Sequence, residues 1–360
     1  MTEGYGYIKA GWFVAGDLVV ERPCIELDLE RGLAAGIGRQ CPPGAADLGR
    51  HTVIMPGLCN AHSHLLDMVL PECGEGLALE ELVAHPHGLK YRLMLERMGH
   101  IADAVKALRL DSVLAATYAE YQLVEPLRGL HGGTRILVYP QPRTKEREEI
   151  ISVLEEYRAV GLDTVFDVTG FLEEFSRRVT SLRARVQVHV SETPDLYHAR
   201  DYEYAYEIPG AVLIHCTLLD AETLAETAMQ KPVVICPTSN ATLTGRLPDL
   251  SRLLQAWRSG EKPLLGIGTD NAAWNEPLVS LELRSSYLLL RGVGRDVAGL
   301  LLYAATIGGH LALGEKYVEA VAASHPAYPH SCNIVSSLVK RLASSTLRSL
   351  GFRLSLEEYS

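Results

Sequence analysis

From residue 110 onward, the sequence alternates between short apolar runs rich in β-branched residues and longer segments with helical periodicity. Strands that alternate with helices form βαβ units, and such units require a parallel sheet. The runs begin about 20 to 30 residues apart, which suits a (β/α)8 barrel. They cover residues 112–121, 134–140, 163–168, 185–190, 211–216, 232–237 and 263–270.

A further run that ends at Gly57 supplies an eighth strand. The predicted fold class is therefore α/β, with a (β/α)8 TIM barrel over residues 57–315. The alternative is a doubly wound open sheet, which would carry a glycine-rich phosphate-binding turn after its first strand. The only candidate for that turn, Gly266-Ile267-Gly268, lacks the rest of the fingerprint and lies inside a predicted strand.

Composition argues against several classes of function. A net charge of −10 and a pI of about 5.7 disfavour a nucleic-acid polymer as partner, because binding to phosphates needs a basic face. The uncharged stretch 297–314 is long enough for a membrane span, but its internal glycines and His310 favour a buried helix instead. The N-terminus carries Glu3 and no continuous apolar core, so no secretory signal is predicted.

The seven cysteines are scattered along the chain, and none belongs to a C-x-x-C pair. This pattern predicts neither a disulfide framework nor a thiolate zinc site, so we expect a reducing, cytoplasmic location. Cys59, Cys216 and Cys236 fall close to predicted strand ends, where we expect them to act as small apolar fillers.

Polar side chains follow the predicted strands at their carboxyl ends, where a barrel carries its catalytic groups. His62 and His64 follow the first strand. Residues i and i+2 of an extended segment point to the same side, so this pair can coordinate one cation. The ends of three later strands add His189, Glu192, His215 and Asp270.

Each of these residues also has a purely structural interpretation when it is taken alone. His62 and His64 could be turn histidines, His215 a hydrogen-bonded core histidine, and Asp270 the N-cap of the next helix. Together they favour a metal site, because several imidazoles with one carboxylate suit zinc or iron(II) better than magnesium or calcium.

A set of motifs over about residues 50–315 carries a family resemblance: PGLCNAHSH, HVSE, LIHC, CPTSN, GTDNAAWNEP and AATIGGHLALG. In order and spacing they resemble the amidohydrolase superfamily. Within it they are similar to the branch that holds S-adenosylhomocysteine/methylthioadenosine, guanine and cytosine deaminases and triazine chlorohydrolases. The segment 74–90 further resembles archaeal members without an assigned substrate.

The resemblance implies a metal site built from His62, His64, His189 and Asp270. One divalent transition metal is expected there, zinc first and iron(II) or manganese as alternatives, and it would activate a water molecule. Binuclear relatives bridge two metals with a carboxylated lysine at the end of strand 4. This chain has no lysine there, at 167–170, so a single metal is expected.

The resemblance also implies catalytic roles for three residues. Glu192 would carry a proton to the substrate ring and then to the leaving ammonia. His215 would hydrogen-bond the attacking oxygen, and Asp270 would accept a proton from the water in addition to binding the metal.

Substrate recognition is expected from the loop after strand 1, about residues 65–100, because loops at this end of a barrel decide specificity. Glu80 or Glu81 would contact a hydroxyl or amine beyond the reacting ring, and Trp274 would form a wall of the pocket. The aromatic residue that adenosine-type deaminases carry beside this glutamate is missing. The alternative is that the loop packs on a neighbouring subunit and its acids face solvent.

Both ends of the chain look β-rich, the second through NIVSSLVKR and LRSLGFRLSL. Relatives fold both ends into one domain, so we expect residues 1–56 and 316–360 to form a small, discontinuous β-sandwich beside the barrel.

The function that the resemblance implies is hydrolysis of a non-peptide C–N bond in a small molecule. The preferred form is an aminohydrolase, or deaminase, of a purine or pyrimidine base, a nucleoside or a related heteroaromatic amine. Two alternatives stay open: a hydrolase of an amide, cyclic amide or triazine-type chloride, and a catalytically inactive relative. No membrane partner is expected, and a homo-oligomer is compatible with the sequence.

Overall fold

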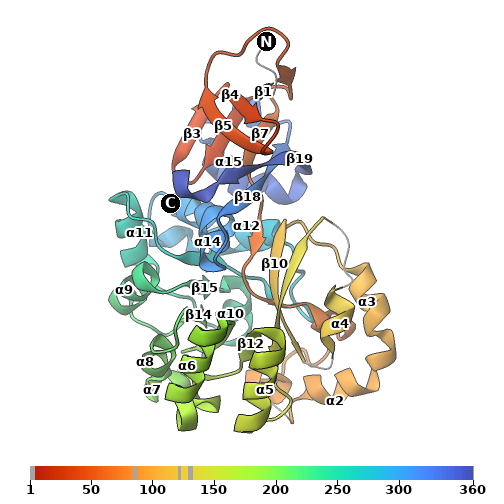
Figure 1. Cartoon of the computed structure of the whole chain (residues 1–360). Coiled ribbons are helices and arrows are strands. Elements are labelled where there is room, and N and C mark those ends of the chain that lie inside the picture. The colour runs from red at the N-terminus through yellow and green to blue at the C-terminus, as the bar shows by residue number, and fades with distance from the viewer. Residues whose placement is uncertain (1–4, 84–86, 121–122, 129–132, 360) are drawn as a thin grey trace.

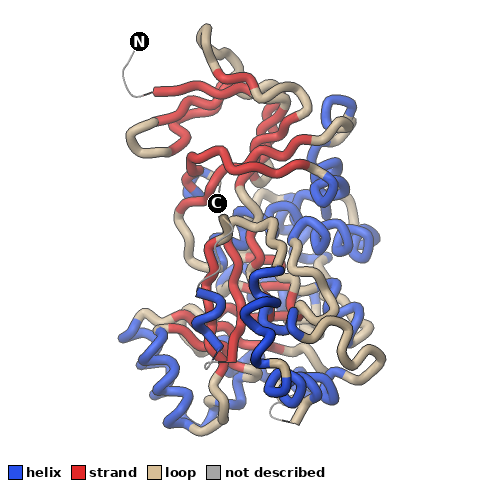
Figure 2. Tube along the Cα trace, turned by 90° about the vertical axis from the view of Figure 1, so that its right-hand side faces the viewer, coloured by secondary structure: helices blue, strands red, loops and turns tan. Residues whose placement is uncertain are grey.

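The computed structural model describes residues 5–83, 87–120, 123–128 and 133–359. Within these ranges the chain forms two parts, a mixed β-sheet at the top of Figure 1 and a helix-covered barrel below it. Figure 2 shows the same division from the side, with the strands of the upper sheet separate from those of the barrel.

The barrel is closed by parallel strands, as the sequence predicts. Two hydrogen-bonded groups, one of three strands and one of five, provide its wall. The gap between the first and last strand is bridged by the Ala61 amide, which donates to the Ile267 carbonyl at 2.9 Å. The strands are β8 (Cys59–Asn60), β10 (Leu114–Glu120), β11 (Arg135–Gln141), β12 (Ala159–Leu162), β13 (Arg185–Val190), β14 (Val212–His215), β15 (Val233–Ile235) and β16 (Leu265–Ile267).

Helices cover the outside of the barrel because each carries an apolar face at helical spacing. In α9 (Ala221–Gln230), Leu224 and Ala228 are buried, and the Asp220 carboxylate caps the helix by accepting from the Thr223 amide at 2.9 Å. The other covering helices are α4 (Val124–Arg128), α5 (Arg147–Tyr157), α6 (Leu172–Leu182), α7 (Pro194–His198), α8 (Asp201–Tyr206), α10 (Pro237–Leu243), α11 (Ser251–Arg258) and α12 (Val279–Leu290).

The uncharged stretch 297–314 forms a buried helix, as predicted. It runs as α13 (Val297–Tyr303), a π-helical turn (Ala304–Gly308) and α14 (Gly309–Ala312). Among the described residues, no helix combines the length and the apolar character needed to cross a bilayer.

The prediction of a strand over 163–168 is wrong, because the fourth strand lies just before these residues. The fourth strand, β12, ends at Leu162, and Val165–Asp167 form a 3-10 turn. The Thr164 side chain accepts from the Phe166 amide, and the Asp167 carboxylate accepts from the Thr164 amide. This capping box ends the extended segment. The residue after the fourth strand is therefore Asp163 and not a lysine.

The described residues between 65 and 107 form a helical cap after the first strand, which we call the cap segment. Its described parts are a 3-10 turn (Leu65–Val69), α1 (Leu79–Val83), α2 (Leu89–Glu96), a second 3-10 turn (Met98–His100) and α3 (Ile101–Ala107). Buried apolar residues of this segment, such as Leu66, Met94 and Val105, form a core of their own above β10.

The second sheet takes strands from both ends of the chain, as predicted. Its order is β3-β2-β7-β18-β19-β5-β4-β1-β6, so two strands from the C-terminal region lie between strands from the N-terminal region. The strands are β1 (Tyr5–Lys9), β2 (Trp12–Ala15), β3 (Leu18–Glu21), β4 (Cys24–Asp28), β5 (Leu33–Gly38), β6 (Ala46–Asp47), β7 (Thr52–Pro56), β18 (Tyr317–Ser324) and β19 (Thr346–Ser355).

One segment of this region is a helix where the sequence analysis expects a strand. NIVSSLVKR folds into α15 (Ile334–Arg341). Asn333 is its N-cap, and the Asn333 side chain accepts from the Ser336 amide at 2.9 Å. Ile334, Leu338 and Val339 are buried because they share one helical face. The N-cap and this spacing decide against the strand.

The expectation that the cysteines form no disulfide is also wrong at one pair. Cys24 at the start of β4 and Cys41 in the loop after β5 are bonded to each other. Cys59, Cys216 and Cys236 are free and fully buried, as the prediction of apolar fillers requires.

Candidate functional site

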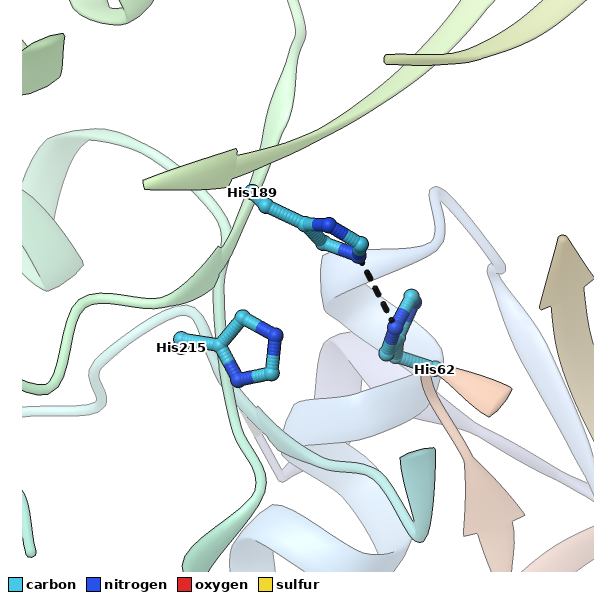
Figure 3. A group of neighbouring side chains, drawn as sticks. All are labelled: His62, His189 and His215. Atoms are coloured by element: carbon cyan, nitrogen blue, oxygen red, sulfur yellow. Dashed lines mark hydrogen bonds between the residues drawn. The ribbon is translucent and has the colours of Figure 1, made fainter. Parts of the chain in front are cut away.

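The carboxyl ends of the barrel strands bring three histidines and one aspartate together. His62 Nε2 lies 3.4 Å from Asp270 Oδ1 and 3.3 Å from His189 Nε2, and His64 Nε2 lies 3.5 Å from the same Asp270 oxygen. Figure 3 shows the rings of His62 and His189 turned toward each other, with His215 beside them.

These three separations are close to those of neighbouring ligands around one zinc ion. Zinc bonds of about 2.0–2.1 Å place neighbouring ligands about 3.3–3.4 Å apart at the corners of a tetrahedron. His62 belongs to two overlapping groups of candidate ligand atoms, one with His64 and Asp270 and one with His189 and His215. His62 is therefore the centre of the donor set.

The protonation states of these groups also suit a cation. Burial lowers the pKa of His64 and of His189 well below the usual value, so both rings are neutral and keep a lone pair. Burial acts to raise the pKa of Asp270, but its contacts with His62 and the other nearby histidines outweigh it and hold that pKa well below its usual range. Neutral imidazoles with one carboxylate are a typical zinc donor set.

The backbone places the ligands by close approach of two strand ends. The short strand β9 (Ser63–His64) pairs in parallel with β17 (Asp270–Asn271), which sets Asp270 beside Ser63. Gly268 makes this approach possible, since a Cβ there would lie 2.6 Å from the His62 carbonyl oxygen. Asp270 itself has φ of +60°, a conformation that costs a non-glycine residue energy and that is concentrated at functional sites.

Gln187 fixes which nitrogen of His62 faces the site. It lies two residues before His189 on β13, so both side chains point into the barrel. The Gln187 amide nitrogen donates to the Ala61 carbonyl at 2.9 Å, which leaves its oxygen to accept from His62 Nδ1 at 3.0 Å. Nδ1 therefore carries the proton of this hydrogen bond, and Nε2 faces the other ligands.

His215 is held in the opposite tautomer. Asn240, buried in α10, donates from its amide nitrogen to His215 Nδ1 at 3.1 Å, so the ring proton is on Nε2. Burial lowers the pKa of His215, which keeps the ring neutral. Its Nε2–H is thus a hydrogen-bond donor and no longer offers a lone pair to a metal.

Glu192 lies directly beside this donor, with Oε2 3.6 Å from His215 Nε2. Burial, followed by the negative charge of Asp270, raises the pKa of Glu192 to about 8. A carboxyl group with such a pKa carries a proton at neutral pH and can donate it, which is the property of a general acid.

A cavity of about 300 Å³ opens above these groups. Glu80 and Trp274 line it, whereas Glu81 does not. The Glu81 carboxylate accepts instead from the Ala78 amide at 2.9 Å at the start of α1. The remaining walls come from His64, Leu79, Val83, Lys90, Tyr91, Gln141, Lys145, Asp163, Thr164, His189, Glu192, Thr193, Leu196, His215, Leu243, Asp270 and Asn271.

His87, in the cap segment, is exposed and does not line the cavity, and His85 lies outside the described residues.

Several residues of the site carry no signal that the sequence analysis used. Gln187 is a polar residue in an otherwise apolar strand, two positions from a candidate ligand, and that pattern could have identified it. Ser239 donates to Asp270 Oδ2, and it lies in the CPTSN motif without a recognisable role of its own. Lys90 and Asp67 meet only because the cap segment folds back over the barrel, which no local pattern predicts.

Comparisons with known proteins agree with this architecture. No protein family model matches the chain. A putative aminohydrolase of Methanothermobacter thermautotrophicus is 24% identical over 303 residues, covering 75% of this chain and 76% of the relative. A 5-methylthioadenosine/S-adenosylhomocysteine deaminase of Pelotomaculum thermopropionicum is 26% identical over 322 residues, covering 77% and 71%.

Among solved structures, an adenosine deaminase of Xanthomonas campestris with bound zinc superimposes with a TM-score of 0.70. It is 20% identical in sequence, and the match covers 98% of this chain and 94% of that one. The chain thus resembles, in sequence and in fold, the deaminase and chlorohydrolase branch of the amidohydrolase superfamily.

Proposed function

We propose that this chain, given its resemblance to the deaminase branch of the amidohydrolase superfamily, is a metal-dependent aminohydrolase that releases ammonia from a heteroaromatic amine. The observation that carries the proposal is a cluster of candidate metal ligands with a protonated carboxyl group beside it. His62, His189 and Asp270 supply the donors, and Glu192 supplies the proton beside them.

In this proposal His62, His64, His189 and Asp270 hold one divalent ion, with zinc preferred. Such an ion lowers the pKa of a water molecule at the site toward neutrality and so supplies a nucleophile. Gln187 keeps the lone pair of His62 Nε2 directed at the ion.

The proton movements are assigned to three side chains. Asp270 accepts a proton from the attacking water, while His215 donates from Nε2 to the oxygen as charge develops on it. Glu192 gives its proton to the ring nitrogen next to the reacting carbon. The water oxygen becomes bonded to that carbon, and the ionised Glu192 then takes the remaining proton of this oxygen and gives it to the departing amine. The C–N bond breaks, ammonia leaves and a carbonyl remains. The proton held by Asp270 passes to Glu192, which restores both carboxyl groups.

The cavity favours a flat substrate of one or two rings with a further substituent. Its volume of about 300 Å³ is at the small end for ligand sites. Trp274 and Tyr91 provide aromatic walls, and Leu79, Leu196 and Leu243 provide apolar ones. We infer a purine, a pyrimidine, a nucleoside or a related amine as the substrate class.

The proposal is tested by an ammonia-release screen with zinc-, iron- and manganese-loaded protein. Purine and pyrimidine bases, nucleosides and pterins that carry an exocyclic amine are the substrates to offer, and we expect ammonia from at least one of them. Chloride release from a chlorotriazine without ammonia from any amine would instead favour the chlorohydrolase alternative. Elemental analysis should find about one ion per chain, because no lysine that could bridge two metals follows the fourth strand.

Glu80 and Glu81 form a matched pair for testing substrate contacts. Once a substrate is known, Glu80→Gln should lower kcat/KM by about 5- to 150-fold, the effect of losing one hydrogen bond to a non-reacting group. Glu81→Gln should change it by less than about twofold, because Glu81 caps α1 and does not line the cavity. Metal content should stay the same in both, and equal losses in the two variants would contradict the assignment of Glu80.

The raised pKa of Glu192 predicts how activity depends on pH. The group donates only while it is protonated, so kcat should fall as pH rises through its pKa, which is about 8 in the structure. A bound divalent cation favours the ionised carboxylate and lowers this pKa, so the descending limb should lie at or below pH 8. A kcat that still rises through about pH 9 would contradict the role of Glu192 as proton donor.

A further inference from the structure

One side chain of the cap segment reaches the candidate ligands from outside the barrel. Lys90, on α2, is 7% exposed, and its ammonium nitrogen lies 3.1 Å from Asp67 Oδ2 and 3.4 Å from Glu120 Oε1. The same nitrogen lies 3.5 Å from Nδ1 of His64, the ring nitrogen that does not face Asp270. We call Lys90, Asp67 and Glu120 the Lys90 cluster.

The Lys90 cluster is joined to the ends of three barrel strands. Asp67 follows the first strand, and its Oδ2 accepts from the Asn271 amide nitrogen at 2.5 Å, beside Asp270 on β17. Glu120 is the last residue of β10. The ammonium of Lys90 thus meets groups fixed by the first, second and eighth strands of the barrel.

The two neighbouring carboxylates hold the Lys90 ammonium at this position. A buried ammonium and two neighbouring carboxylates are each costly without the others, so removal of one partner leaves an uncompensated charge. The ion pairs can form only when α2 lies where it does, with Lys90 directed down between the strand ends. The cluster therefore fixes the placement of α2 over the cavity.

The cluster also occupies the outer side of His64. The Lys90 ammonium lies 3.5 Å from His64 Nδ1, so it packs against the edge of the ring that points away from Asp270. Asp67 and Glu120 in turn hold this ammonium in place.

We propose that the Lys90 cluster is a positioning element that orients His64 and couples the placement of α2 to retention of the metal. This inference rests on the proposed metal site. Lys90 and Asp67 act through His64 and do not touch the reacting atoms. Loosening the cluster should thus loosen both the helix above the cavity and the ion below it.

The test uses two variants and two measurements on the full chain. Lys90→Met removes the ammonium and keeps the length of the side chain. The double variant Lys90→Met/Asp67→Asn keeps the net charge of the cluster unchanged. It leaves only the partly exposed Glu120 carboxylate without the ammonium, whereas the single variant also leaves the buried Asp67 carboxylate without it. The first measurement is the rate at which zinc-loaded protein releases zinc to a chelator, and the second is amide hydrogen exchange of α2, residues 89–96.

Both variants should release zinc about 10- to 100-fold faster than the unmodified chain, the usual effect of losing an outer partner of a metal ligand. The amides of α2 should exchange faster in the same variants. Unchanged release with faster exchange would show that the cluster holds α2 alone, and faster release with unchanged exchange would show that it serves His64 alone. Either result overturns the coupling, and so does no change in both.

Two other variants calibrate these measurements. Lys106→Met is the same substitution in the same segment, but Lys106 is 78% exposed and pairs with the exposed Asp103, so neither rate should change. Gln187→Met removes the outer partner of His62 from within the barrel and should speed zinc release without affecting α2. Failure of the unmodified chain to bind zinc would count against the proposed function itself, whereas normal binding with normal release in both Lys90 variants would count against this inference only.

Discussion

Replacement of Glu192 by glutamine should leave zinc content unchanged and slow turnover by about 10²- to 10⁴-fold, the usual contribution of a positioned proton donor. Glutamine has nearly the same shape, so the packing beside His215 is kept, but its amide has no proton to give to a ring nitrogen. The measurement is kcat with a substrate from the ammonia-release screen, together with elemental analysis of the same preparation.

The matched control for this variant is Glu282→Gln. Glu282 is a second buried glutamate near the site, but its carboxylate accepts from the Thr238 amide and the Ser286 hydroxyl and does not line the cavity. Its loss should affect stability more than proton transfer. If Glu192→Gln lost metal as completely as a ligand variant, Glu192 would be a ligand and the assigned role would be wrong.

The second large effect is expected from His62→Ala. His62 Nε2 faces both Asp270 Oδ1 and His189 Nε2, so its removal takes the central donor out of the set. Zinc content should fall from about one ion per chain to near zero, and turnover should fall with it, because a tetrahedral site with a missing donor loses both affinity and geometry. Elemental analysis after dialysis and the ammonia assay measure the two losses.

His198→Ala provides the comparison for His62→Ala. His198 is an exposed histidine at the end of α7, close in sequence to Glu192 but outside the donor set. It should keep zinc and activity. A His62→Ala protein that retains a full equivalent of zinc would mean that the ion is held by other groups and that the proposed site is wrong.

The barrel and the strand-end residues could be predicted because both depend on local pattern. Apolar runs at regular spacing mark parallel strands, and polar residues just after such runs are conspicuous in a chain of this composition. His62, His189 and Asp270 meet for that reason alone, since the carboxyl ends of all the strands lie at one end of the barrel.

The errors arose where a short signal has two interpretations. The run 163–168 is β-branched and apolar, but Thr164 and Asp167 form a capping box that turns the chain. The run 333–341 mixes valine and isoleucine with serine, and the N-cap at Asn333 with one buried face decides for a helix. In both cases the side-chain cap, not the propensity of the run, determines the element.

Other features depend on contacts across long distances in the chain. Gln187 reaches His62 across 125 residues, and the disulfide joins two cysteines whose proximity follows from the pairing of β4 with β5. The Lys90 cluster requires the cap segment to fold over the strand ends. Such contacts are set by tertiary structure, and periodicity or spacing contains no information about them.

The interleaved order of the upper sheet has a consequence for the way the chain is made. Strands β18 and β19 separate β7 from β5, so without them the sheet divides into a part with β3, β2 and β7 and a part with β5, β4, β1 and β6. During synthesis, residues 5–56 leave the ribosome before the barrel, and residues 317–355 leave it after the barrel. The edge of β7 that pairs with β18 therefore stays unpaired until the entire barrel has been synthesised. Pairing across so long a stretch of chain is slow, and an unpaired edge can associate with other nascent chains. Removal of β18 and β19 should thus leave the barrel with two small sheets that are not hydrogen-bonded to each other.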